Sequence, residues 1–234
     1  MMVKDKKAIK KKVASDWQTA FPQLAAFAQD KFYKIIGPLV VGIELINIQR
    51  IEGYRPHFMI YPLWGNNRGH DLKACLDAPA VYSAIRNRKG LQLDIPYIKH
   101  GGYFAEAVEC TKTQISIPLD KDVSLKVLYN MVNIYFYDIL VQANSAIQAN
   151  LHQFKLYAAL YTGSNDQVQS VLDQIQLERG SWNMQQFEMA FTNFDKWLQG
   201  LQEMLNHRDE FIARVLSIKQ DKKLEKLQRS ELVP

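Results

Sequence analysis

Apolar residues in the last third of the chain recur at alternating steps of three and four. They are Met184, Phe187, Phe191, Phe194, Leu198, Leu201, Leu205, Ile212 and Val215. Such steps average about 3.5 residues, which keeps one stripe of a helix turned toward a partner helix. Only Gly200 weakens the run, and no proline occurs between Pro118 and Pro234. The pattern predicts one long helix from Asn183 to about Ser217, with a coiled-coil-like seam along it.

A second stripe of the same kind lies between Leu119 and Thr162, where neither glycine nor proline occurs. Asn144 and Ser145 compete for backbone hydrogen bonds and can divide this run into two helices. We expect a shorter helix over 166–177 to turn the chain, so that the two stripes pack together antiparallel within one molecule. Small residues of the second stripe favour this pairing, because they leave room for the phenylalanines of the first. Pairing between two copies of the chain stays the alternative.

The beginning of the chain predicts two helices. Ile9, Val13, Trp17 and Phe21 recur every four residues, which is typical of one buried helix face. A second helix is expected over 22–36, because it opens with a proline and is followed by Gly37 and Pro38.

A predicted hairpin follows. The run 39–51 is rich in β-branched residues, Glu52 and Gly53 form a turn, and 54–64 forms the second strand. Pro56 and Pro62 cannot donate to a ladder, so this strand is either an edge or paired on one side only at those positions. Alternating apolar residues predict a further strand over 91–97.

Two more segments complete the first half. Asp71 is placed to cap a short helix. The segment after His100 is expected to form a short helix or an irregular stretch, followed by a strand from Thr111 to Ile117. The sequence therefore predicts an α+β fold. N-terminal helices with a small, mostly antiparallel sheet occupy residues 1–118, and an all-helical region of long packed helices, a bundle or an antiparallel hairpin, occupies 119–234.

The net charge of +5 is concentrated at the two ends of the chain. Residues 1–12 hold six lysines and one aspartate, and residues 219–234 hold five basic and three acidic groups. We interpret these ends as solvated helix tips, with nucleic-acid binding as a lesser alternative. No apolar run approaches the roughly 18 residues of a membrane span, and no apolar stretch follows the first lysines, so we expect a cytoplasmic protein without membrane contact.

Common catalytic and metal motifs are not found in this sequence. Cys75 and Cys110 have neither a CxxC spacing nor a second pair, so we expect two reduced, buried thiols. The glycines at 37 and 42 lack the lysine that a phosphate-binding loop needs. We therefore expect no metal and no cofactor, and lean away from an enzyme.

If a site exists, polar and aromatic groups in the loops of the first half are its candidates. They are Arg55, His57, Asn67, Arg68, His70, His100 and Tyr103. Such groups suit an anionic or nucleotide-like ligand. His100 precedes two glycines, although an ordinary exposed turn histidine is the simpler interpretation. His152 and His207 are expected on polar helix faces, and Trp64 in the core.

Two functions are compatible with these features. The first is a protein-interaction or scaffold protein that presents its helical surface to a protein partner, or to a second copy of itself. The alternative is a nucleic-acid- or nucleotide-binding accessory factor, or an enzyme, that acts through the polar loop residues of the first half. A strict monomer without exposed apolar side chains on its helices would count against the first function.

Overall fold

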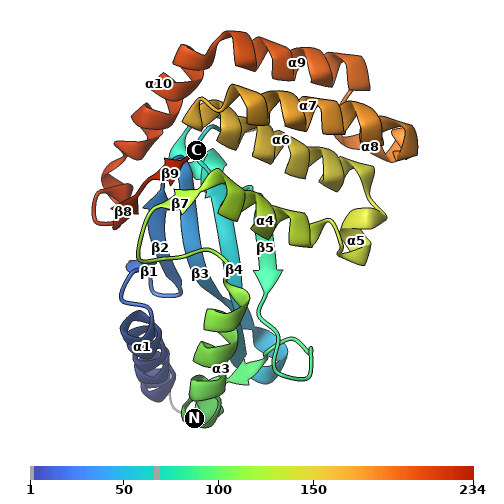
Figure 1. Ribbon diagram of the computed structural model, residues 1–234. Coiled ribbons are helices and arrows are strands. Elements are labelled where there is room, and N and C mark those ends of the chain that lie inside the picture. Colours follow the sequence, from blue (N-terminus) through green and yellow to red (C-terminus); the bar gives the residue numbers. More distant parts are fainter. Residues whose placement is uncertain (1–2, 66–68) are drawn as a thin grey trace.

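The computed structural model describes residues 3–65 and 69–234, and it confirms the α+β architecture (Figure 1). A sheet occupies the centre, and most of the later helices are stacked at one end of it. Helices α1 (Val3–Ala20) and α3 (His100–Gln114) lie toward the other end (Figure 1). The face of α1 predicted from the four-residue spacing is indeed turned inward, because Val13 and Trp17 are buried.

The main sheet has seven strands, five of them in the order β1-β2-β3-β4-β5 with antiparallel neighbours. These are β1 (Ala25–Ala28), β2 (Lys31–Ile36), β3 (Leu39–Ile48), β4 (Gly53–Pro62) and β5 (Val81–Ala84). Two short strands extend it: β6 (Ile95–Pro96) pairs with β4, and β8 (Arg229–Ser230) pairs in parallel with β2.

The predicted hairpin is confirmed as β3 and β4, with Glu44 opposite His57. A 3-10 turn over Gln49–Ile51 connects the strands. β4 is an inner strand, but β5 pairs with it only from His57 to Ile60. Pro62 pairs with β3 alone, as the one-sided alternative predicts, whereas the carbonyl of Pro56 also accepts a hydrogen bond from the backbone N–H of Ile85, at 3.0 Å. Neither proline can donate to a second ladder.

Three local predictions in the first half are wrong. Residues 22–36 form β1 and β2 instead of a helix, because β3 needs a partner along its free edge and tertiary pairing overrides a weak helical pattern. The strand predicted over 91–97 reduces to Ile95–Pro96. The segment 111–117 begins inside α3, where the Thr111 hydroxyl donates to the carbonyl of Ala107 at 2.7 Å. The predicted short helix after Asp71 is confirmed as α2 (Leu72–Leu76), and Asp71 caps it.

The second half contains the predicted helices, but in shorter pieces. They are α4 (Leu125–Tyr135), α5 (Ile139–Gln142), α6 (Ser145–Thr162), α7 (Asn165–Glu178), α8 (Met184–Ala190), α9 (Phe194–Asn206) and α10 (Arg208–Lys219). The predicted division at Asn144 is confirmed, since its side chain accepts hydrogen bonds from the backbone N–H groups of Ala146 and Ile147. The break before α5 was not predicted. There Asp138 caps the new helix.

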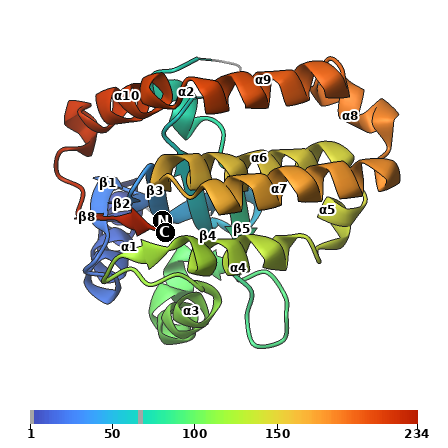
Figure 2. The same cartoon turned by 45° about the horizontal axis from the view of Figure 1, so that its top comes forward.

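The single helix predicted over 183–217 is wrong. Phe191 adopts an extended backbone conformation, Asn193 caps α9, and the chain breaks again at His207. Each break lets the chain wrap around α6 instead of running straight past it (Figure 2). The apolar stripe nevertheless faces inward, because Phe187, Phe194 and residues farther along it are buried.

The two stripes meet within one chain, which was the favoured pairing. Nε1 of Trp197 in α9 donates to Oε1 of Gln153 in α6 at 2.9 Å. The rings of Trp182, Phe187 and Phe194 form part of an aromatic cluster beside this contact. Helix α6 is consequently buried on most of its circumference, and not along a single seam.

The C-terminal segment returns to the sheet, which the sequence did not predict. β9 (Leu232–Val233) pairs with β7 (Val123–Ser124), while β8 extends the sheet beside β2. The region after residue 119 is thus helical except for these two-residue strands. The division of the chain at residue 118 stays a prediction. Of the helices that the structure describes, none combines the length and apolar character needed to cross a membrane.

Candidate functional site

The predicted site residues of β4 lie on one face of the sheet and are held by neighbours. Nε of Arg55 donates to Oδ1 of Asp94 at 2.6 Å. This hydrogen bond lowers the pKa of Asp94. His57 is buried; its Nδ1 donates to the carbonyl of Arg55 at 3.2 Å and its ring lies 4.5 Å from that of Tyr82. Burial lowers the pKa of His57.

His100 lies on the opposite face, so the predicted residues do not form one site. Its Nδ1 is 2.7 Å from the hydroxyl of Tyr54, whose side chain points away from those of Arg55 and His57 because residues alternate along a strand. Its Nε2 is 2.9 Å from Oδ2 of Asp16. The interpretation of His100 as an exposed turn residue is wrong, since it is only 4% exposed.

The remaining predicted residues are separated from both groups. His70 is exposed in the loop before α2, and Tyr103 is 39% exposed on α3. Asn67 and Arg68 lie outside the described residues. The described members of the predicted set are therefore not brought together at one place.

A buried carboxylate group lies beside His57 on the same face of the sheet. Glu44 accepts hydrogen bonds from the hydroxyls of Tyr33 and Tyr61, the latter at 2.6 Å, and from Nζ of Lys31 at 3.2 Å. Burial is the main cause that raises the pKa values of both tyrosines. Both tyrosine hydroxyls therefore stay protonated and donate to Glu44. The hydrogen bond to Glu44 also holds the Lys31 ammonium group at the edge of the cluster.

A second polar cluster is buried among the helices. His152 is fully buried, and its Nε2 donates to Oε2 of Glu178 at 2.8 Å. Lys155 is 4% exposed and donates to Asn133 and Gln174. The polar helix face predicted for His152 is wrong, because α7 covers that side of α6. Burial lowers the pKa values of both His152 and Lys155.

Four large apolar side chains of the helical half are exposed within one short stretch, whereas Leu177 and Met189 are exposed singly elsewhere. The α5 surface, as we name it, consists of Ile134, Tyr137, Ile139 and Leu140, with exposed fractions of 60%, 81%, 76% and 72%. It spans the end of α4 and the first turn of α5. In contrast, the apolar side chains of α6 that follow are mostly buried. Ile139 belongs to the second apolar stripe predicted between Leu119 and Thr162, but the unpredicted break at Asp138 leaves it exposed.

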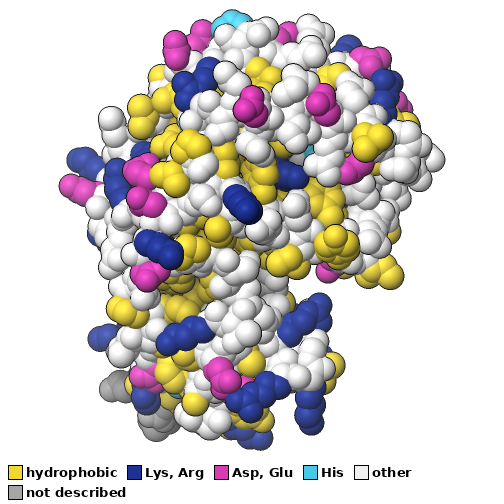
Figure 3. Space-filling view, in the orientation of Figure 1, with side chains coloured by type: hydrophobic (Ala, Val, Ile, Leu, Met, Phe, Trp, Pro, Cys, Tyr) yellow, Lys and Arg dark blue, Asp and Glu magenta, His cyan; other side chains and the backbone are white. Residues whose placement is uncertain are grey.

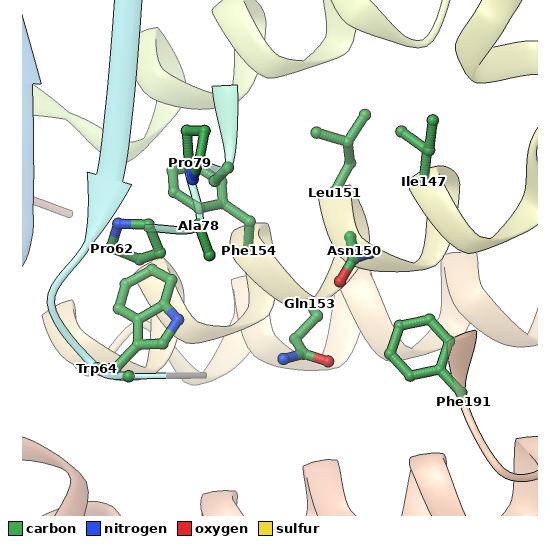
Figure 4. A pocket seen from close by; sticks show the side chains of 12 residues that line it. Pro62, Trp64, Ala78, Pro79, Ile147, Asn150, Leu151, Gln153, Phe154 and Phe191 are labelled. Atoms are coloured by element: carbon green, nitrogen blue, oxygen red, sulfur yellow. The ribbon is translucent and has the colours of Figure 1, made fainter. Parts of the chain in front are cut away.

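A cleft of about 470 Å³ lies near this surface, between α6 and the end of β4 (Figure 4). The rings of Trp64 and Phe154 lie on one side of it and that of Phe191 on the other, with Gln153 between them (Figure 4). Ile147 also lines the cleft and is 39% exposed in the first turn of α6, directly after α5. The apolar lining therefore leads toward the α5 surface.

The surface is hollowed below α5, with hydrophobic side chains above the hollow and basic side chains on its lower rim (Figure 3). The segment after β5 lies below it and carries Arg86, Arg88 and Lys89, all exposed. Arg88 is paired with Glu109 at 2.6 Å. An apolar wall beside a basic rim is complementary to a segment with apolar and acidic groups.

Among the described residues, no three histidine, cysteine, aspartate or glutamate side chains gather to hold a metal ion. Both cysteines are free and buried, as predicted. Comparison of the chain with family models, curated proteins and solved structures found no match.

Proposed function

We propose that the protein is a protein-interaction module of the cytoplasm, and that it binds an amphipathic helix of a protein partner at the α5 surface. The observation that carries the proposal is the exposure of four large apolar side chains within residues 134–140. Contiguous exposed apolar groups are typical of interaction surfaces, whereas scattered single ones are not. The proposal gives the chain a binding role and not a catalytic one.

The shape of the region supports a helical ligand. Ile139 and Leu140 are exposed on the first turn of α5, and Ile147 lines the cleft that Phe191 also lines. A helix that lies in such a groove contacts it with residues spaced three and four apart. The basic rim carried by the segment after β5 favours acidic residues along the flank of the ligand.

A photo-crosslinking experiment tests the proposal in cells. A photoreactive phenylalanine analogue replaces Tyr137 at the α5 surface, and the same analogue replaces Tyr103 on α3 as the control. We expect one discrete protein adduct from position 137 that is not formed from position 103, and mass spectrometry identifies it. Equal adducts from both positions would contradict the proposal.

Binding of the identified partner is then measured with purified proteins by calorimetry. The double variant Ile139→Asp with Leu140→Asp should raise the Kd by about a hundredfold, because two apolar side chains are no longer buried against the partner. Ile98→Asp is the matched control, since Ile98 is 69% exposed and lies in the turn Tyr97–Lys99 directly before α3, a helix at the other end of the molecule from α5 (Figure 1). The proposal fails if the double variant binds as tightly as the control.

A further inference from the structure

A second pocket, of about 620 Å³, has none of the residues of the α5 surface in its lining. Its lining comes from three segments: the β1–β2 hairpin, α2 and the chain after α10. Phe27, Leu72 and Leu76 form the apolar part, and Lys31, Lys73, Asp77, Lys222, Lys223 and Lys226 form the charged part. Pockets of this volume accommodate small molecules.

The charge of the lining is strongly one-sided, with five lysines and one aspartate. Lys31 is neutralised by Glu44, at 3.2 Å. None of Lys73, Lys222, Lys223 and Lys226 forms an ion pair with any other described residue. Four ammonium groups around one pocket repel one another, and an anion placed between them removes that repulsion.

The backbone that carries Lys222, Lys223 and Lys226 is held in place by the fold. The carbonyl of Gln228 accepts from the backbone N–H of Ile35 at 2.9 Å, which begins the β8 pairing with β2. Leu224 and Leu227 are buried, and Asp221 caps the 3-10 helix Lys222–Leu224. Lys222, Lys223 and Lys226 are exposed, as expected of solvated basic groups, but the segment that carries them is tied to the sheet and is not a free helix tip.

The opposite side of the pocket is also rigid. Lys31 is fixed through Glu44 to the buried hydroxyls of Tyr33 and Tyr61. The ring of Phe27 is tilted against that of Tyr33 at 5.2 Å between centroids. The apolar part of the pocket, Lys31 and the backbone of the C-terminal segment are thus held by the fold, which lowers the entropy cost of binding, whereas the other four lysine side chains are exposed.

We propose that this pocket binds a phosphorylated small molecule with an apolar or aromatic body. The phosphate oxygens accept hydrogen bonds from Lys73 and the lysines of segment 222–226, while the body lies against Phe27, Leu72 and Leu76. The site is independent of the proposed protein-binding function, because it shares no residue with the α5 surface or its cleft.

Calorimetric titration of the full chain tests the site with three probes at low and high salt. ATP carries phosphates on an aromatic body, lysophosphatidic acid carries one on an acyl chain, and pyrophosphate has no body. We expect one of the first two to bind with 1:1 stoichiometry and with an affinity that falls as salt is raised. Whichever of them binds identifies the source of the phosphate. Binding of none of the three overturns the proposal.

Two double variants with the same loss of charge separate a specific site from diffuse attraction. Lys223→Gln with Lys226→Gln removes two rim lysines, whereas Lys126→Gln with Lys196→Gln removes two exposed lysines elsewhere. We expect the first to weaken binding about tenfold or more and the second to change it little. Equal weakening by both pairs refutes the site.

The apolar part of the pocket, formed by Phe27, Leu72 and Leu76, is tested separately. Phe27→Ala should weaken binding of the ligand with a body and leave pyrophosphate binding unchanged, with circular dichroism as the check on folding. If pyrophosphate binds as tightly as the better of the other two probes, the apolar residues do not contact the body of the ligand and this part of the proposal is overturned. A Lys73→Gln variant, on α2, serves in the same assay as a rim substitution that leaves the C-terminal segment intact.

Discussion

The hydroxyl of Tyr54 lies 2.7 Å from Nδ1 of His100, and the contacts on either side fix which atom donates. Nε1 of Trp17 can only donate, and it donates to the Tyr54 oxygen at 3.1 Å. The tyrosine proton is therefore directed to Nδ1 of His100. The other ring nitrogen, Nε2, then carries the proton that is donated to Asp16 at 2.9 Å. The chain of bonds ties α1 and α3 to β4.

The first prediction concerns this network. Replacing His100 by alanine leaves the Tyr54 hydroxyl and the Asp16 carboxylate without that partner in a largely buried place. We expect the free energy of unfolding to fall by about 1–3 kcal/mol, measured by urea denaturation. His207→Ala is the control, because His207 is exposed, and it should change stability by less than about 0.5 kcal/mol. Similar losses in both variants would contradict the role of the network.

The second prediction is a dependence of stability on pH. Burial lowers the pKa values of His57, His100 and His152 from the usual 6.5, so these rings bind fewer protons in the folded than in the unfolded chain. Stability is then complete above pH 6.5 and declines as pH falls below it toward the folded pKa values. The lowered pKa values of Asp16 and Asp94 also make stability fall as the pH falls, but only below pH 3.8.

Urea denaturation at pH 7.5, 6.5 and 5.5 measures this decline. The variant His152→Gln should reduce the slope between the last two pH values, because it removes one of the rings that protonate on unfolding. His207→Gln, which changes an exposed ring, is the matched control. If stability is constant from pH 7.5 to 5.5, the pKa values of the buried histidines are not lowered in the folded chain.

The third prediction concerns Glu44. Replacement by alanine leaves two buried tyrosine hydroxyls and Lys31 without their shared acceptor, and we expect a loss of about 3–5 kcal/mol. Glu44→Gln keeps one acceptor oxygen and should lose less. Glu225→Ala, at an exposed position, is the control in the same denaturation series. If Glu44→Ala is as stable as the wild type, the prediction is contradicted.

The fourth prediction compares two glycines. Gly37 has a φ of +53°, and a Cβ there would lie 2.6 Å from Cβ of Leu232 in β9. Gly37→Ala should therefore destabilise the chain by about 1–3 kcal/mol. Gly101 is in α3 and a Cβ there meets nothing within 4 Å, so Gly101→Ala should stabilise by roughly 0.4–1 kcal/mol. Thermal unfolding of both variants checks the two signs, and a shift of Tm in the same direction would contradict the account.

Local patterns were sufficient to predict much of the secondary structure. The four-residue spacing of Val13 and Trp17 defined α1, and the run of β-branched residues before Gly53 defined the hairpin. The inward stripe that includes Phe187 and Phe194 was also predicted correctly. These features depend on periods of about two and 3.6 residues, which can be counted within a short window of sequence.

The candidate sites were much less predictable, because each depends on a break or a pairing that no local pattern contains. The cap at Asp138 turned Ile139 outward and created the α5 surface. The pairing of β8 with β2 brought Lys223 and Lys31 into the lining of one pocket, although the first was expected at a helix tip and the second within a helix. The described residues of the predicted polar set are apart for a similar reason, since alternation along β4 places Tyr54, which contacts His100, on the face opposite His57.

The sequence by itself determined the α+β order, the hairpin and which side of most helices is apolar. Only the tertiary structure decided where the helices break, which faces remain uncovered and which charges meet. The contact between His100 and Asp16 joins residues 84 positions apart, and that between Gln228 and Pro22 joins residues 206 positions apart. Contacts over such distances are fixed by the competition of all segments for burial and hydrogen bonds, and not by the periodicity of any one of them.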